Sequence, residues 1–187
     1  MKVGIIDTAF WLYGDLRISA IEQIHFLELL YLRKLGFKDH SYEVLKEIML
    51  DSKTDNYQIY GKTGWVDDIG WYVGYVETKK GVWLFATRLE GVNKSIFTND
   101  SLKANEEYKP ASTFKILHTL IALDGKYISE LDTIKWDKKI RAIDLWNSDQ
   151  TLKSAFKYSC VWAYEAIEKR IGIVNYQKYL DQSNYEI

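Results

Sequence analysis

Between residues 57 and 89 the side-chain pattern changes from helical to strand periodicity, and this change constrains the fold more than any other feature. The runs 57–65, 70–78 and 82–89 are rich in aromatic and β-branched residues, which favour strands. Lys79-Lys80-Gly81 separates the last two runs and suits a tight turn. The pattern predicts a meander of three antiparallel strands, to which residues 94–98 add a fourth.

Helical patterns stand on both sides of this predicted sheet. Ser19 and Glu22 fit a capping box, and the apolar spacing that follows predicts a helix to about Lys34. A shorter helix is expected from near Ser41, and four more at 112–124, 149–158, 161–171 and 173–181. We therefore expect an α+β fold in one domain over residues 1–187. Residues 52–110 should form mainly a sheet lobe, and residues 8–50 and 111–187 mainly a helical lobe, with a cleft between the two.

Charge and composition exclude several classes of protein. The 25 Lys and Arg residues balance 26 Asp and Glu residues, so neither a nucleic-acid partner nor a membrane surface is expected. No apolar run approaches the roughly 20 residues needed to span a bilayer. Cys160 is the only cysteine, and His25, His40 and His118 are too scattered for a metal site, so no metal is expected. Asp7 interrupts the apolar start of the chain, and we expect no signal peptide in it.

The strongest local motif is Ser112-Thr113-Phe114-Lys115, just after the only proline, Pro110. Positions i and i+3 share one face of a helix, so the serine hydroxyl and the lysine amine can meet. Burial lowers the pKa of a lysine, and a neutral lysine can take the hydroxyl proton of a serine nucleophile. Taken alone, the motif is more often a serine near a helix start with a solvated lysine.

Two further segments strengthen the catalytic interpretation. Lys62-Thr63-Gly64 lies on a predicted strand, where the charge and hydroxyl suit an anionic substrate and the glycine lets a ligand approach the backbone. An ordinary strand face with a glycine bulge is the alternative. Ser159-Cys160-Val161 lies between two predicted helices, where Ser159 could project into a cleft or simply cap the second helix.

Together the three motifs resemble the signatures of the penicillin-recognising serine enzymes, and most closely those of the class D, or oxacillinase-type, β-lactamases. Longer stretches are similar as well. They are residues 10–14 (Phe-Trp-Leu-Tyr-Gly), 16–20 (Leu-Arg-Ile-Ser-Ala), 70–77 (Gly-Trp-Tyr-Val-Gly-Tyr-Val-Glu), 108–116 (Tyr-Lys-Pro-Ala-Ser-Thr-Phe-Lys-Ile) and 146–152 (Trp-Asn-Ser-Asp-Gln-Thr-Leu). The resemblance implies a β-lactamase/transpeptidase-like fold with an antiparallel sheet lobe and a helical lobe.

The order of the segments differs from the family pattern. Residues 1–91 resemble the second half of the family and residues 94–187 its first half, so the chain resembles a circularly permuted and shortened member. The link Glu90-Gly91-Val92-Asn93 then reads as a hairpin that replaces terminal elements. Tyr185 matches the start of the family's Tyr-Gly-Asn motif, but Glu186 and Ile187 do not. The arginine that usually holds the substrate carboxylate has no clear counterpart, and Arg88 cannot be equated with it.

The resemblance also implies a role for each motif residue. Ser112 would be the nucleophile, and its N–H group with that of Trp65 would form the oxyanion hole. Lys115 would carry a carbamate formed from CO2, with no other cofactor, and Trp11 and Val161 would stabilise it. Proton relay and positive potential at the leaving nitrogen would come from Ser159 and Lys62. The residues expected to contact substrate are Thr63, Gly64, Trp146 and Leu12.

The implied function is hydrolysis of β-lactam antibiotics, with a periplasmic or secreted location. One alternative is a β-lactam-sensing receptor domain that is acylated without turnover. Another is an inactive permutant of the fold. Because a missing terminal helix would leave one face of the sheet uncovered, a homodimer is expected to complete the sheet lobe.

Overall fold

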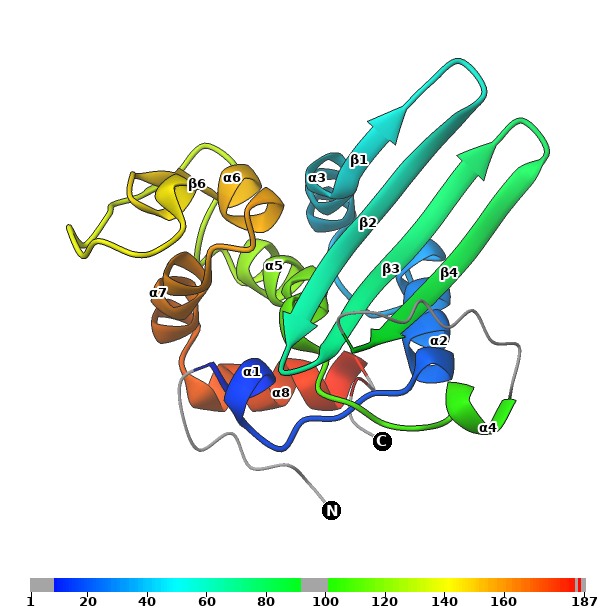
Figure 1. The fold of residues 1–187 in the computed structure, drawn as a ribbon. Coiled ribbons are helices and arrows are strands. Elements are labelled where there is room, and N and C mark those ends of the chain that lie inside the picture. Colours follow the sequence, from blue (N-terminus) through cyan, green and yellow to red (C-terminus); the bar gives the residue numbers. More distant parts are fainter. Residues whose placement is uncertain (1–8, 92–100, 184, 186–187) are drawn as a thin grey trace.

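The computed structural model describes residues 9–91, 101–183 and 185. The strand predicted at 94–98, with the hairpin that would lead into it, lies outside these residues. The described chain is an α+β structure in which one antiparallel sheet packs beside a group of helices (Figure 1).

The sheet has four strands in the order β1 (Leu50–Lys53), β2 (Tyr57–Val66), β3 (Ile69–Thr78) and β4 (Gly81–Glu90). All neighbours are antiparallel, and β2 pairs with β3 in continuous register from Tyr57 opposite Thr78 to Val66 opposite Ile69. The predicted meander is therefore confirmed. Strand β1 was not predicted, because its four residues, Leu-Asp-Ser-Lys, lack a strand-like apolar alternation.

The remaining elements are helices with one small second sheet. The α-helices are α1 (Phe10–Tyr13), α2 (Ala20–Tyr31), α3 (Asp39–Met49), α4 (Ser101–Ala104), α5 (Lys115–Asp124), α6 (Leu152–Lys157), α7 (Val161–Ile171) and α8 (Ile173–Ser183). Two 3-10 turns are η1 (Ala111–Phe114) and η2 (Asp144–Trp146), and the small sheet pairs β5 (Thr133–Ile134) with β6 (Gln150–Thr151).

The predicted capping box at the start of α2 is present. The Glu22 N–H donates to Ser19 Oγ at 3.2 Å, and the Ser19 N–H donates to Glu22 Oε2 at 2.6 Å. The helix ends at Tyr31 rather than near Lys34. Arg33 adopts a left-handed backbone conformation with φ of 55°, which turns the chain away from the helix axis.

Two other predicted helices begin later than expected. The segment 112–124 opens with the 3-10 turn η1, and α5 starts only at Lys115. The segment 149–158 opens with β6, whose residues pair with β5 before α6 begins at Leu152. Helical side-chain spacing cannot separate a tight 3-10 turn from an α-helical one, and pairing with a distant strand leaves no local signal.

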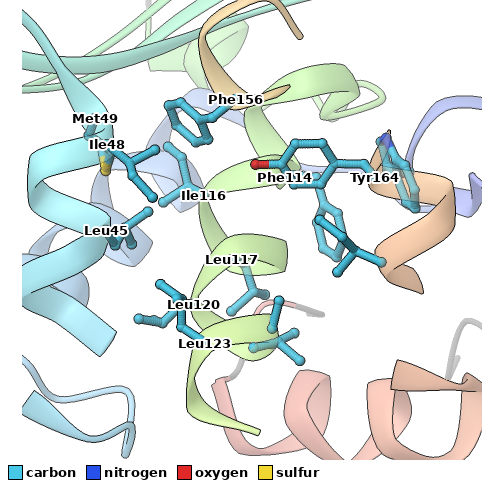
Figure 2. Close-up of a cluster of buried hydrophobic side chains, with 14 of the residues drawn as sticks. Leu45, Ile48, Met49, Phe114, Ile116, Leu117, Leu120, Leu123, Phe156 and Tyr164 are labelled. Carbon is cyan, nitrogen blue, oxygen red and sulfur yellow. The ribbon is translucent and has the colours of Figure 1, made fainter. Parts of the chain in front are cut away.

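Helix α5 is the centre of the hydrophobic core (Figure 2). Ile116, Leu117 and Leu120 have no exposed surface. Figure 2 shows Leu45, Ile48 and Met49 of α3 on one side of this helix and Tyr164 of α7 on the other. Because α5 begins at Lys115, three residues after Ser112, the packing of this helix fixes the position of the motif.

Only one face of the sheet is covered by described helices. Helices α2 and α3 lie against it (Figure 1), where the ring of Tyr31 contacts that of Tyr75 and Lys46 Nζ lies over the ring of Tyr60. Alternation along paired strands puts Tyr57, Trp65 and Trp83 on the other face, where they are 39%, 58% and 65% exposed.

We expect Leu117→Ala to lower the free energy of unfolding by about 2–5 kcal/mol, because it removes a fully buried side chain and leaves a cavity. Urea denaturation followed by circular dichroism measures the change. Leu131→Ala is the matched control, since Leu131 is 87% exposed and its truncation should cost less than about 0.5 kcal/mol. Equal losses in the two variants would contradict the placement of the core on α5.

Candidate active site

The site begins where the edge of strand β2 meets the turn η1. Strand β1 pairs only with Gln58–Tyr60 of β2, so the rest of this edge is free to face η1. Gly64 makes the close approach possible, because a Cβ atom there would lie 3.1 Å from the backbone nitrogen of Thr113 and 3.2 Å from the oxygen of Pro110. A larger residue at position 64 would push the strand away from Ser112.

Ser112 and Lys115 meet as their spacing predicts. Lys115 Nζ donates a hydrogen bond to Ser112 Oγ at 2.9 Å, although this turn is 3-10 rather than α-helical. Ala111, directly before the serine, has φ of 50°, a conformation that is rare for residues other than glycine. Such backbone strain occurs mainly where the surrounding structure holds a functional side chain in place.

Lys115 is surrounded by apolar and aromatic groups. Its side chain has no exposed surface, and Nζ lies 5.8 Å from the ring centre of Trp11 and 5.1 Å from that of Tyr164. Burial, together with a smaller effect of the nearby charge of Lys62, lowers the pKa of Lys115 to about 7. A large share of this amine is therefore neutral near pH 7 and can accept the hydroxyl proton of Ser112.

A second lysine–serine pair lies beside the first. Lys62 Nζ on β2 donates to Ser159 Oγ at 2.5 Å and to the carbonyl oxygen of Thr63 at 2.8 Å. Burial lowers the pKa of Lys62 to about 8. Ser159 has φ of 52°, and the residue that caps α7 is Cys160, so Ser159 is not a helix cap. Its hydroxyl instead joins the sheet lysine to the helical lobe.

Trp11 lies beside the lysine, and Val161 lines the cleft at the start of α7. Trp11, on α1, is fully buried and stacks on Phe114 with the ring centres 5.9 Å apart. Its indole nitrogen has no hydrogen-bond partner among the described residues. Val161 is the first residue of α7 and is partly buried. A buried N–H donor without a partner is costly, so this indole nitrogen would be stabilised by an acceptor other than the described residues.

These groups open onto a cleft of about 790 Å³. Eight of the eleven residues selected from the sequence line it, namely Leu12, Thr63, Gly64, Trp65, Ser112, Trp146, Ser159 and Val161. The other three are buried. Lys62 and Lys115 hydrogen-bond to Ser159 and Ser112 of this lining, and Trp11 directly precedes Leu12 of the lining. The tertiary structure thus brings all of the selected residues together.

Sequence reasoning missed part of the cleft wall. Tyr13, Thr87, Leu89 and Ile143 also line it, and Thr87 and Leu89 alternate along β4 with Arg88. Arg88 therefore points to the other face, where it is 11% exposed and pairs with Glu90 at 2.9 Å. Strand alternation could have predicted this placement. It excludes Arg88 as a contact for a ligand in the cleft.

Tyr185 lies in the core rather than in the cleft. It is 3% exposed, and its ring packs edge-on against Phe26 and Phe114, with centroid distances of 4.9 and 5.3 Å. Among the described residues there is no group of three His, Cys, Asp or Glu side chains that could hold a metal ion. In the same part of the chain, no helix has the length and apolar character needed to cross a membrane.

Comparison with protein families identifies the chain. The family model of the penicillin-binding protein transpeptidase domain matches it in two overlapping segments, residues 2–107 and 92–187. The chain belongs to this family. The matched ranges do not specify the order of the two segments within the family, so the circular permutation stays a prediction.

Among curated proteins, this transpeptidase-domain chain is similar to β-lactamases of the OXA type. Beta-lactamase OXA-10 of Pseudomonas aeruginosa is 43% identical over 94 residues, which cover 50% of this chain and 35% of the relative. Beta-lactamase OXA-48 of Klebsiella pneumoniae is 43% identical over 124 residues, which cover 65% and 45%. The chain therefore spans less than half the length of these curated relatives.

Solved structures of class D β-lactamases are similar in sequence over part of the transpeptidase-domain chain. That of Sebaldella termitidis is 44% identical, with a TM-score of 0.42, over 43% of this chain and 34% of the other. FUS-1 (OXA-85) of Fusobacterium nucleatum subsp. polymorphum is 40% identical, with a TM-score of 0.42, over 50% and 38%.

The lowered pKa of Lys115 predicts how its burial affects stability. Between about pH 7 and the ordinary lysine pKa of about 10.5, the unfolded chain binds a proton that the folded chain does not. The penalty for burying this lysine is therefore largest below pH 7 and disappears as the pH rises toward 10.5. Lys115→Met should stabilise the fold by a few kcal/mol at pH 6 and by much less at pH 10.

Urea denaturation of both proteins at the two pH values, in bicarbonate-free buffer, measures this difference. Lys169→Met on α7 is the matched control, because Lys169 is exposed and its loss should give no pH-dependent gain. A Lys115→Met gain that is the same at pH 6 and pH 10 would contradict a buried, largely neutral amine.

Proposed function

We propose that this chain hydrolyses β-lactams through an acyl-enzyme on Ser112. The observation that carries the proposal is the hydrogen bond of 2.9 Å between Ser112 and the fully buried Lys115, at the base of the 790 Å³ cleft. A nucleophile within reach of a neutral base is the arrangement that acyl transfer requires. The similarity to proteins named as class D β-lactamases supports the substrate class.

Acylation would use both lysine–serine pairs. Lys115 takes the hydroxyl proton as Ser112 Oγ attacks the lactam carbonyl, and the N–H groups of Ser112 and Trp65 stabilise the oxyanion. The lactam C–N bond then breaks, and the nitrogen receives a proton from Ser159. Ser159 takes a proton in turn from the Lys62 ammonium, which donates to its Oγ at 2.5 Å.

Substrate binding would use the walls of the same cleft. Thr63 would hold the substrate carboxylate with its hydroxyl, and Gly64 leaves room for the substrate against the edge of β2. Trp146 and Leu12 offer apolar contact from the helical side. Water that enters the cleft hydrolyses the ester on Ser112 and releases the product.

The resemblance implies a CO2-derived carbamate on Lys115, and the residues present fit such a group. Lys115 is neutral enough to react with CO2, since burial lowers its pKa to about 7. The Trp11 indole N–H is buried, has no partner within residues 9–91, 101–183 and 185, and would donate to a carbamate oxygen, while Val161 would restrict water. When present, the carbamate supplies an oxygen base for the acylation and deacylation steps.

Two other functions are compatible with the same fold. Measuring repeated product release from a β-lactam distinguishes them from a hydrolase. A β-lactam-sensing receptor would be acylated once and would release no further product. An inactive permutant would be neither acylated nor active. The partly buried Val161 and the unpartnered indole of Trp11 favour the hydrolase, because both suit a lysine that stays carbamylated through deacylation. Steady hydrolysis of a chromogenic cephalosporin supports a hydrolase, whereas a single stoichiometric burst indicates a sensor.

A periplasmic or secreted location is part of the same proposal. It follows from the family resemblance and from the substrate, since β-lactams reach their targets outside the cytoplasm. Cell fractionation of the natural host, with an antibody against this chain, tests the location directly.

Ser112→Ala should abolish covalent labelling by penicillin while the fold stays intact, because the variant lacks the attacking oxygen. Intact-mass and peptide mass spectrometry measure the adduct on the peptide that contains Ser112. Ser52→Ala in β1 is the control, because Ser52 does not line the cleft and its loss should leave labelling unchanged. Retained labelling of the Ser112→Ala variant would remove Ser112 as the nucleophile.

Added bicarbonate should raise the activity, most strongly below pH 7, where protonation of Lys115 drives off the carbamate. Without bicarbonate the rate should fall as the pH drops through about 7. Trp11→Phe should raise the half-maximal bicarbonate concentration roughly tenfold or more, because a hydrogen bond to a charged group is lost. Bicarbonate titrations of the initial rate measure both effects, and a wild-type rate that never depends on bicarbonate would indicate an unmodified amine base.

We also propose that two copies form a homodimer through the exposed face of the sheet. Trp83 and Tyr57 are 65% and 39% exposed there, and burying each such side chain is worth about 1.5–3 kcal/mol. Light scattering at micromolar concentration should give twice the chain mass of 22.0 kDa. Trp83→Lys should shift the protein to monomer, whereas Leu131→Lys on an unrelated exposed site should not. A stable wild-type monomer would contradict the dimer.

A further inference from the structure

A buried polar side chain on α2 contacts the turn that carries Ser112. Gln23 is fully buried, on the helix face that also presents Leu27 and Leu30 at helical spacing. Its Nε2 atom donates a hydrogen bond of 2.9 Å to Thr113 Oγ1, and Thr113 is 1% exposed. An amide within an apolar helix face is costly unless it is hydrogen-bonded, so the contact with Thr113 offsets that cost.

The hydroxyl of Thr113 in turn closes the turn η1. It donates to the carbonyl oxygen of Pro110 at 2.6 Å, and the Thr113 N–H donates to the same oxygen at 3.2 Å. A threonine hydroxyl has one proton to donate, so its second partner must itself be a donor. Gln23 supplies that donor. We call this chain of hydrogen bonds, from Gln23 through Thr113 to Pro110, the Thr113 clamp.

The Thr113 clamp encloses strained backbone. Ala111, with φ of 50°, and Ser112 lie between the two residues that the hydroxyl bond joins. The chain just before the clamp is fixed as well, because the carbonyl oxygen of Lys109 accepts from the Trp71 indole at 3.1 Å. A left-handed conformation is unfavourable for alanine, so contacts on both sides are needed to hold it.

The same atoms set the gap between Ser112 and strand β2. A Cβ atom at Gly64 would lie 3.1 Å from both the nitrogen and Cγ2 of Thr113, and 3.2 Å from the oxygen of Pro110. Trp65 directly follows Gly64, so the clamp also sets the separation between the N–H groups of Ser112 and Trp65. A misplacement of about 1 Å at a reacting group can cost roughly 100-fold in rate.

We propose that Gln23 and the Thr113 hydroxyl are positioning residues, which hold the strained turn at Ala111 and thereby fix the N–H group and the hydroxyl of Ser112 for acyl transfer. The inference rests on the proposed acyl-enzyme. Both side chains are buried and neither lines the cleft, so they act through Ser112 and not on the substrate. A positioning residue changes the rate of the covalent step, whereas a residue that only stabilises the fold changes the fraction of folded protein.

The test measures acylation of Ser112 by penicillin, with rapid quenching and intact-mass detection. The concentration dependence of the rate separates the acylation rate constant from the dissociation constant of the noncovalent complex. Thr113→Val and Gln23→Met, which keep the shape but lose the hydrogen bond, should each lower the rate constant roughly tenfold or more, with the dissociation constant within about twofold. Thr113→Ser, which keeps the hydroxyl, should recover most of the rate.

Ser183→Ala is the matched control. Ser183 is 2% exposed, and its hydroxyl also donates to a carbonyl oxygen three residues earlier, that of Leu180, at 3.2 Å. It lies on α8 and does not line the cleft, so its acylation rate constant should equal that of the wild type. Circular dichroism at the assay temperature shows that each variant is folded, and Thr113→Val keeps the test decisive where Gln23→Met does not fold.

Two kinetic outcomes would overturn the proposal. One is an unchanged acylation rate constant in a folded Thr113→Val or Gln23→Met variant. The other is a Thr113→Ser rate constant as low as that of Thr113→Val, because the hydroxyl would then have no role of its own.

Ala111→Gly tests the strain directly. Glycine adopts a positive φ without steric cost, so this turn no longer has to be held against strain. Added to Thr113→Val, Ala111→Gly should raise the acylation rate constant roughly fivefold or more, the scale set by the cost of a left-handed conformation for alanine. An unchanged rate constant in the double variant would overturn the holding of this turn as the role of the clamp.

Crystal structures of the wild type and of Thr113→Val test the clamp independently of acyl transfer. In the variant, Ala111 should leave its positive φ or the Ser112 nitrogen should move relative to that of Trp65, and an unchanged turn overturns the proposal. If the turn moves but penicillin does not label the wild type, the proposed acyl-enzyme fails, and the positioning role falls with it. If the wild type is labelled and the variants are acylated at the same rate, the positioning role alone fails.

Discussion

The burial of the Lys115 amine beside Ser112 is the constraint on which the rest of the site depends. A lysine without solvent contact loses its charge readily, and this loss makes it a base near neutral pH. Trp11, Phe114 and Tyr164 provide the apolar walls, and the fully buried residues of α5 fix the helix that begins at the lysine. The site is thus an extension of the hydrophobic core, opened on one side to the cleft.

Such an arrangement is costly, and the costs are concentrated at the site. Three residues at the site have left-handed backbone conformations: Ala9, two residues before Trp11, Ala111, directly before Ser112, and Ser159, which lines the cleft. Two lysines are buried close together, and in the part of the chain that the structure describes the indole nitrogen of Trp11 and the ring nitrogens of His118 have no hydrogen-bond partner. The surrounding core holds these strained elements in place, which is the usual compromise between stability and a reactive arrangement.

The site is assembled from five separate parts of the chain: residues 11–12, 62–65, 112–115, 146 and 159–161. Their contacts depend on where the helices and the edge of β2 lie in space, not on the order in which the chain visits them. A circular permutation would therefore leave the geometry of Ser112, Lys115 and Lys62 unchanged, provided that the same elements pack. The exposed aromatic face of the sheet, by contrast, depends on which elements the chain contains.

Local patterns in the sequence were sufficient for the strand meander, for the capping box at Ser19 and for most helices, because alternation and capping chemistry act over a few residues. The same patterns indicated Ser112 and Lys115, whose separation is one turn. Local patterns did not predict strand β1 or the 3-10 turn at Ser112, because strand pairing and turn type depend on distant partners. The tertiary structure alone decided that Lys115 is buried and that Lys62 of the sheet meets Ser159 of the helical lobe beside it. Burial and proximity arise only when segments far apart in sequence pack together, and they set the protonation state of the amine.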